Sequence, residues 1–172
     1  MKTETRPTAH LLHGFVGAGK TTFARKLEHD HRAVRFTHDE WMHLLYGADP
    51  PADRFTEFSG RVDELVWRTA LRLLALRIDV ILDFGFWTRR SRDEARSRVL
   101  ACGARPLLYS IDCPEEAMRD RVEQRTRHLP DDSLSINQPA FDLFKSRFEP
   151  LTDDEVAIRV DGTSVHENAS RG

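Results

Sequence analysis

Short apolar runs alternate along the chain with longer segments in which apolar residues recur every three or four positions. The apolar runs predict strands, and the wider spacing predicts helices. Strands are expected at residues 8–13, 33–36, 79–84, 105–111 and 156–160. Helices are expected at residues 20–29, 39–45, 61–77, 91–102, 114–126 and 141–148. Residues 47–60, which contain Pro50-Pro51 and two glycines, and residues 127–139 are expected to be irregular.

Strand and helix follow one another in a regular alternation. This order is typical of an α/β protein with a parallel sheet covered by helices on both faces. The unbroken run Val80, Ile81 and Leu82 indicates a strand that is buried on both faces. In such sheets ligands bind beyond the carboxyl ends of the strands, so polar residues that directly follow a strand are the first candidates for function. The helix at residues 61–77 is expected to bury its apolar positions, which are Val62, Leu65, Val66, Leu73 and Leu76.

The composition indicates one globular domain over residues 1–172, with a polar tail at residues 163–172. Apolar residues make up 40% of the chain and charged residues 31%, and the net charge of −2 argues against a broad surface for a polyanion. Two cysteines are too few for a disulfide scaffold. With no signal peptide and no apolar run of membrane-spanning length, we expect a cytoplasmic protein without membrane contact. Four histidines are expected on the surface rather than in a metal site: His10, His13, His29 and His31.

The most specific motif lies between the first predicted strand and the first predicted helix. Residues 14–21 match the phosphate-loop pattern G-x-x-x-x-G-K-[ST] in its required context. Glycines let successive backbone N–H groups turn toward phosphate oxygens, and the helix N-terminus adds partial positive charge. Lys20 is expected to reach the terminal phosphates, and the Thr21 hydroxyl to bind Mg²⁺. The expected nucleotide-binding residues are Gly14, Phe15, Val16, Gly17, Ala18, Gly19, Lys20, Thr21 and Thr22.

With this loop in place, the chain resembles the small P-loop kinases of the zeta-toxin and polynucleotide-kinase-like group, also described as AAA-type predicted kinases. The resemblance runs from Leu11 to about Asp161. It implies a three-layer P-loop NTPase fold, with a five-stranded parallel sheet in the order 2-3-1-4-5 and a small helical lid at about residues 119–139. It also implies ATP and Mg²⁺ as cosubstrate and metal. Segments 147–150 and 159–162 resemble those that border the adenine in this group.

Two aspartates lie at predicted strand ends: Asp39 comes after the second strand, and Asp83 is at the end of the third. Asp39, in "FTHDEW", matches the position that in the resembling kinases contacts the acceptor hydroxyl as general base; the alternative is that it caps the helix at residues 39–45. Asp83, in "VILDFGFW", resembles a Walker-B carboxylate that holds Mg²⁺ through water, although in some of these kinases the position faces the acceptor. Asp39 is therefore the first candidate for the base, and Asp83 for the metal.

Several further residues could complete the site. In "MRDRVEQRTRH", Arg121 and Arg125 share a helix face and match the lid arginines of the resembling kinases; surface ion pairing is the alternative. Five aromatic residues either wall an acceptor pocket or belong to the core: Trp41, Tyr46, Phe84, Phe86 and Trp87. Three arginines that follow could bind an anionic acceptor or be solvated helix charges: Arg89, Arg90 and Arg92.

The sequence therefore predicts ATP- and Mg²⁺-dependent phosphoryl transfer to a hydroxyl. The absence of an N-K-x-D segment argues against a GTPase, and the length argues against an oligomeric motor. A small metabolite or antibiotic is the leading acceptor. A polynucleotide 5′-hydroxyl and a UDP-sugar are the alternatives, and a nucleotide-binding regulator with little turnover is the alternative of another class. The sequence does not indicate an oligomeric state.

Overall fold

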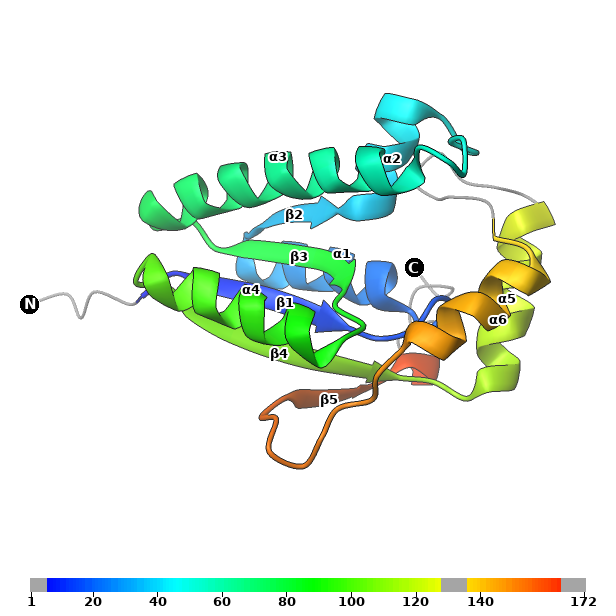
Figure 1. Ribbon diagram of the computed structural model, residues 1–172. Coiled ribbons are helices and arrows are strands. Elements are labelled where there is room, and N and C mark those ends of the chain that lie inside the picture. Colours follow the sequence, from blue (N-terminus) through cyan, green and yellow to red (C-terminus); the bar gives the residue numbers. More distant parts are fainter. Residues whose placement is uncertain (1–5, 128–135, 165–172) are drawn as a thin grey trace, which may run out of the picture.

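The computed structural model describes residues 6–127 and 136–164 and contains a five-stranded parallel sheet in the order β2-β3-β1-β4-β5 (Figure 1). The strands are β1 (Thr8–His13), β2 (Val34–Thr37), β3 (Val80–Gly85), β4 (Arg105–Asp112) and β5 (Ile158–Asp161). The helices are α1 (Lys20–His31), α2 (His38–Tyr46), α3 (Phe55–Ala75), α4 (Arg89–Ala101), α5 (Glu115–Arg127) and α6 (Gln138–Arg147). The predicted strand order and helix-strand alternation are confirmed.

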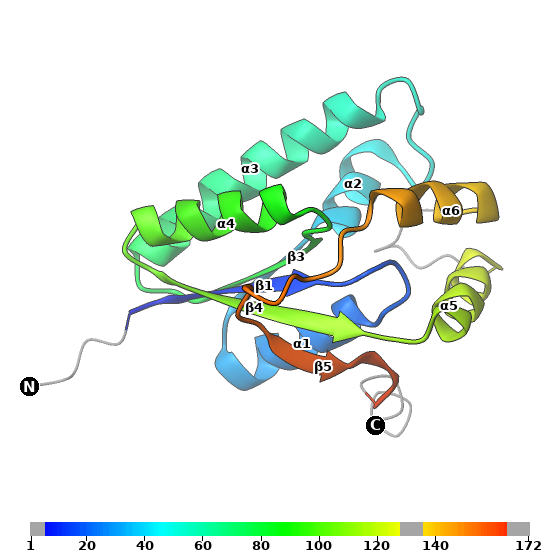
Figure 2. The same cartoon turned by 60° about the horizontal axis from the view of Figure 1, so that its bottom comes forward.

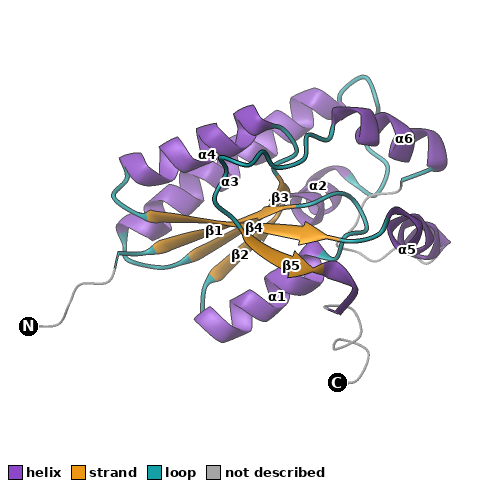
Figure 3. Ribbon diagram, turned by 90° about the horizontal axis from the view of Figure 1, so that it is seen from below, coloured by secondary structure: helices purple, strands orange, loops and turns teal. Residues whose placement is uncertain are grey.

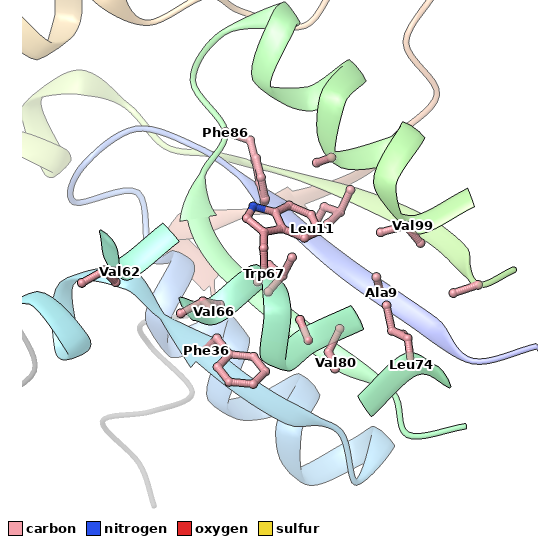
Figure 4. Packing of buried hydrophobic residues seen from close by; sticks show 14 of the residues in the cluster. Ala9, Leu11, Phe36, Val62, Val66, Trp67, Leu74, Val80, Phe86 and Val99 are labelled. Atoms are coloured by element: carbon pink, nitrogen blue, oxygen red, sulfur yellow. The ribbon is translucent and has the colours of Figure 1, made fainter. Parts of the chain in front are cut away.

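Helices cover both faces of the sheet, with α3 and α4 on one side and α1 on the other (Figure 3). The larger core lies under α3 and α4, where Leu11, Val80 and Val66 pack together (Figure 4). The smaller core lies under α1, where Leu12, Ile81 and Leu27 pack together. Neighbouring residues of one strand thus serve opposite faces, as the alternating direction of side chains along a strand requires. All central strands end near α5 and α6, which lie beyond the tips of β1 and β4 (Figure 2).

The prediction that residues 47–60 are irregular is wrong in its second half, because α3 begins at Phe55. The helix buries every fourth residue from Phe58 to Leu74 against the sheet. The free energy gained by burying these residues outweighs the helix-weakening effect of the exposed Gly60. Leu65 and Leu76, which were expected to be buried, lie off the stripe and are 44% and 70% exposed.

Helix α6 also begins earlier than predicted, at Gln138. The Asn137 side chain caps it by accepting a hydrogen bond from the Ala140 N–H at 2.9 Å, and Pro139 fits in the first turn. Part of the predicted lid, residues 128–135, and most of the predicted polar tail lie outside the described residues.

The expectation that His10 and His13 lie on the surface is wrong. Both are almost fully buried, because β1 is the central strand and is covered on both faces. His13 Nδ1 lies 3.1 Å from the Phe86 carbonyl, and His10 Nδ1 lies 3.0 Å from the Tyr109 hydroxyl. Burial lowers the pKa of His10 to about 4, so it is neutral near pH 7. Across the described ranges, none of the helices has the length and apolar character needed to span a membrane.

Candidate active site

The phosphate-loop motif forms the turn between β1 and α1. Gly17 and Gly19 have φ values of 78° and 103°, which other residues adopt at a cost. A Cβ atom on Gly17 would lie 2.6 Å from the carbonyl oxygen of Met118 in α5, so the loop also needs glycine for close packing. Gly19 is the N-cap of α1 and no side chain caps the helix there, which leaves the first-turn N–H groups available to an anion.

Lys20 is the first residue of α1 and folds back over the loop. Its Nζ donates a hydrogen bond to the carbonyl of Phe15 at 2.8 Å. Burial lowers the pKa of Lys20 and the charge of Arg125 adds to this, whereas Asp83 and Asp39 act in the opposite direction. Lys20 therefore lies among the other charged residues predicted for the site. Thr22, also in the first turn of α1, is half-buried.

Asp83 lies in the second half of β3, and its side chain reaches the start of α1. Its Oδ2 accepts hydrogen bonds from the Thr21 hydroxyl at 2.8 Å and from the Thr37 hydroxyl at 3.3 Å. Burial raises the pKa of Asp83, the charge of Asp39 adds to this, and Lys20 opposes it. Because Asp83 is only 5% exposed, its charge favours a nearby cation.

The residues at this point fit a magnesium ion. The Thr21 hydroxyl and the Asp83 carboxylate are hard oxygen donors 2.8 Å apart, of the kind that Mg²⁺ prefers. Within residues 6–127 and 136–164, no group of three or more His, Cys, Asp or Glu side chains could hold a metal. A magnesium ion here would therefore depend on nucleotide phosphates and water for its remaining ligands, as is usual for this ion.

Asp39 lies in the first turn of α2, one residue after its start. Thr37 is the N-cap residue, so the capping alternative for Asp39 is wrong. The Asp39 side chain is 42% exposed and its Oδ1 lies 3.6 Å from His38 Nδ1. Burial acts to raise the pKa of Asp39, but the contact with His38 and the charges of Lys20 and Arg125 outweigh it, so the pKa is lowered. Asp39 is therefore an ionised, partly exposed carboxylate beside the phosphate loop.

The two arginines of α5 differ in their contacts. Arg121 Nη1 donates to the carbonyls of Gly17 and Gly162, each at 3.2 Å, and so braces the phosphate loop. Arg125 is half-buried, and its Nε and Nη2 atoms are buried without a hydrogen-bond partner among the described residues. Its charge acts on Lys20 and Asp39. An unpaired guanidinium at this point is suited to a phosphate group.

An aromatic cluster packs the phosphate loop against helix α6 and the residue that follows it. Phe15 packs edge-on against Phe141 and Phe148, with ring centroids 4.9 and 5.4 Å apart, and Trp87 lies 5.6 Å from Phe15. Trp87 Nε1 also donates to the carbonyl of Gly14 at 3.2 Å. Because this cluster joins the loop to α6, the position of α6 is coupled to the shape of the loop.

The other aromatic candidates belong to the larger core. Phe86 is 6% exposed within it, and Trp41, Tyr46 and Phe84 pack against it as partly buried residues. Tyr46 stacks on Phe58 with ring centroids 3.9 Å apart. Of the five predicted aromatics, Trp87 is the one that contacts the phosphate loop.

Both predicted adenine-bordering segments pack near the phosphate loop. Gly162 packs so closely that a Cβ atom on it would lie 2.1 Å from the carbonyl of Ala18. Phe148, in the other segment, stacks on His13 with ring centroids 4.9 Å apart. Because Phe148 also packs against Phe15, both segments contact the nucleotide-binding loop directly.

The three arginines that follow β3 are all engaged by carboxylates. Arg89 pairs with Asp93 and Asp154, and Arg90 pairs with Glu94. Arg92 is fully buried and binds Glu155 through two contacts of 2.7 and 2.8 Å. Arg92 is therefore neither a solvated helix charge nor a residue that is free for an acceptor.

Two residues with defined contacts were not predicted from the sequence: His38, which contacts Asp39, and Glu155, which pairs with Arg92. His38 could have been noticed, because it directly precedes Asp39 at a strand end. Glu155 lies 63 residues from Arg92 and carries no local signal that would pair them.

Comparison with known proteins agrees with this fold and loop. Residues 10–151 match the family model AAA_33, described as an AAA domain, and the chain belongs to this family. No curated protein matches the sequence.

Solved structures share the fold at low sequence identity. Kti12 from Chaetomium thermophilum, in complex with ADP-AlF3, is 15% identical and has a TM-score of 0.68, with 95% of this chain and 97% of that chain covered. The APS kinase CysC from Mycobacterium tuberculosis, in complex with AMPPNP and APS, is 15% identical with a TM-score of 0.62 and 96% of both chains covered. A chain of the Pnkp1/Rnl/Hen1 RNA repair complex is 22% identical with a TM-score of 0.64, and this chain covers 49% of it with 87% of its own length.

Proposed function

We propose that this protein transfers the γ-phosphate of ATP to a hydroxyl group of a small molecule. The observation that carries the proposal is the position of Asp39, an ionised carboxylate that is 42% exposed and lies near Lys20 of the phosphate loop and Arg125 of α5. A protein that only senses ATP needs the loop and the cations, but it has no use for a proton acceptor beside them.

Each group then has a role in the transfer. The loop N–H groups, Lys20 and Arg125 bind the phosphates and balance the charge that develops on the transferred group. Asp39 orients the acceptor hydroxyl and takes its proton as the oxygen bonds to the γ-phosphorus, while the bond to the bridging oxygen breaks and ADP leaves. Thr21 and Asp83 would hold Mg²⁺, which would supply further neutralisation of phosphate charge.

The arginines near β3 support an uncharged acceptor. A site for a phosphorylated or carboxylated acceptor needs a cation with hydrogen-bond donors to spare. Arg92 is fully buried against Glu155, and Arg89 is paired with both Asp93 and Asp154, so neither of them is available for this purpose. A small polyhydroxyl compound is therefore the acceptor we favour, in accordance with a sugar kinase among the structures of similar fold.

A polynucleotide 5′-hydroxyl is the second candidate, because the fold also occurs in a protein of an RNA repair complex. The net charge of −2 weighs against it, since binding to a phosphate backbone is driven largely by cations.

The substitution Asp39→Asn tests the proposal directly. Asparagine preserves the size of the side chain but cannot take the proton, so transfer should fall about 10²–10⁴-fold. ATP binding, which depends on the loop, should be unchanged in a fluorescence titration with an ATP analogue. Asp53→Asn, an exposed aspartate in the turn before α3, is the matched control and should leave both measurements unchanged. Transfer at the parental rate by Asp39→Asn, in a protein that melts like the parent, would reject Asp39 as the base.

A further inference from the structure

His38 is the first residue of α2 and lies between three elements. Its side chain is only 14% exposed. Nδ1 faces Asp39 Oδ1 at 3.6 Å, and on the other side of the ring Nε2 lies 3.1 Å from the Ser59 hydroxyl and 3.7 Å from Asp63 Oδ1, both in α3. The ring of Phe84 in β3 packs edge-on against it at 5.7 Å. Both ring nitrogens therefore have an acceptor within reach.

These surroundings favour the doubly protonated imidazolium. Burial opposes a charge on the ring, but Asp39, Asp63 and the contact with Ser59 outweigh it, so the pKa of His38 is raised above its ordinary value of 6.5. In its charged form the ring has two N–H donors and no lone pair, and it then donates to its neighbours and does not accept the proton of a hydroxyl.

We propose that His38 is a positioning residue, which orients the carboxylate of Asp39 for proton transfer and anchors it to helix α3. This inference rests on the proposed function. His38 engages Oδ1 of Asp39, which leaves Oδ2 as the atom that accepts the proton of the acceptor hydroxyl. Ser59 and Asp63 fix the far side of the ring, in the way that a carboxylate on the outer ring nitrogen fixes a metal-binding histidine. The position of the base is thereby coupled to α3 as well as to the phosphate loop.

The competing explanation is that His38 only fastens α2 to α3. A fastening role predicts a loss of stability with no change in how Asp39 titrates. The charged groups around Asp39 are His38 from α2, Lys20 from α1, Arg125 from α5 and Asp83 from β3. Replacing His38 with glutamine changes only the first of these, so a change in the titration of Asp39 can be assigned to it.

The first test needs no substrate. The imidazole of His38 is titrated by NMR in the parent and in Asp39→Asn, with the exposed His29 of α1 as internal control. We expect the pKa of His38 to fall in Asp39→Asn. An unchanged His38 pKa would overturn the inference, because it would mean that the two side chains do not interact.

The second test measures phosphate transfer to the hydroxyl compound that the parent phosphorylates fastest. His38→Gln should lower kcat about 10- to 100-fold, the usual effect of misplacing a reacting group, with ATP affinity unchanged. Because His38 lowers the pKa of Asp39, its removal should shift the acidic limb of the kcat/KM profile to higher pH. The double variant His38→Gln/Asp39→Asn should be no slower than Asp39→Asn alone, and His29→Gln should match the parent.

The outcomes separate this inference from the proposed function. A parental pH profile in His38→Gln, or additive losses in the double variant, would overturn the positioning role and leave the kinase assignment intact. A parent that transfers phosphate to no hydroxyl compound would overturn the proposed function and this role with it, whatever the NMR titration shows.

Discussion

The buried ion pair between Arg92 and Glu155 should dominate the stability of the C-terminal part of the fold. Both side chains are fully buried, and two hydrogen bonds of 2.7 and 2.8 Å join them. Arg92 also donates to four backbone carbonyls, of Phe86, Trp87, Glu149 and Pro150, at 3.1–3.4 Å. The pair thus fastens the segment that connects α6 and β5 to the loop after β3.

The substitution Glu155→Gln removes the counter-charge and leaves the guanidinium buried. Breaking a buried pair in this way costs about 3–5 kcal/mol. The four carbonyl contacts of Arg92 remain, so we expect a loss of about 3 kcal/mol, near the lower end of that range. In a protein of this size each kcal/mol lowers the melting temperature by about 2–4 °C, so a decrease on the order of 10 °C is expected.

Urea denaturation at pH 7, followed by circular dichroism, measures the change in the free energy of unfolding. Glu94→Gln is the matched control, because it breaks an ion pair with Arg90 on the exposed side of the same region, where the two side chains are 52% and 88% exposed. That control should cost less than about 0.5 kcal/mol. Glu155→Gln with a stability equal to that of Glu94→Gln would refute the reasoning.

At low pH the difference in the free energy of unfolding between Glu155→Gln and the parent should disappear. The hydrogen bond from Arg92 lowers the pKa of Glu155 from 4.5 to about 2, although burial opposes this. A carboxyl whose pKa is lower in the folded state stabilises the fold above its unfolded pKa and loses that contribution as pH falls through the folded value. The gap in stability should therefore shrink between about pH 4.5 and pH 2, and a constant gap over this range would contradict the assignment.

Three further substitutions test the phosphate site. Lys20→Ala should abolish turnover and weaken ATP binding, because it removes the positively charged side chain that lies over the loop. Calorimetry measures the binding, and turnover at the parental rate would disprove the loop assignment. Arg125→Ala should lower kcat about 10²–10³-fold with a smaller effect on ATP affinity. The control Arg127→Ala, in an exposed ion pair on the same helix, should leave kcat unchanged. An equal loss of kcat in both variants would indicate general damage to α5. Gly17→Ala should weaken ATP binding at least about tenfold, because the new methyl group would clash with Met118 and the backbone φ would be strained. Gly47→Ala is the control for backbone strain alone, because Gly47 has φ +84° and open space around its Cβ position.

Features set by short stretches of sequence were predicted well. The phosphate loop lies within eight consecutive residues, and strand β1 was predicted at its observed bounds. The fully apolar run in β3 and the helix-strand alternation were enough to give the sheet order once the family resemblance was recognised. The loop and β1 depend on neighbours in the chain, so a sequence pattern predicts them, whereas the sheet order came from the family resemblance.

Features that depend on distant contacts were missed. The start of α3 at Phe55 follows from packing of Phe58 and Val62 on the sheet, which outweighs the breaking signal of Pro50-Pro51 and Gly60. His10 was assigned to the surface because a histidine in a strand gives no sign of which strand is central. The positions of Asp39 and Arg125 relative to each other, which define the candidate site, are set by the approach of α5 to α2 and cannot be read from either segment alone.

Transfer of the γ-phosphate to a hydroxyl tests the central claim most directly. The parent and Asp39→Asn are incubated with Mg²⁺ and γ-labelled ATP in the presence of polyols, sugars, nucleosides, a UDP-sugar and a 5′-hydroxyl oligonucleotide, and labelled products are separated from inorganic phosphate. We predict that the parent moves the label onto a hydroxyl of at least one small compound, and that Asp39→Asn binds ATP but does not. Label that stays in ATP or appears only as inorganic phosphate, with every acceptor and with the parent folded and ATP-bound, would contradict the assignment and indicate a nucleotide-binding regulator.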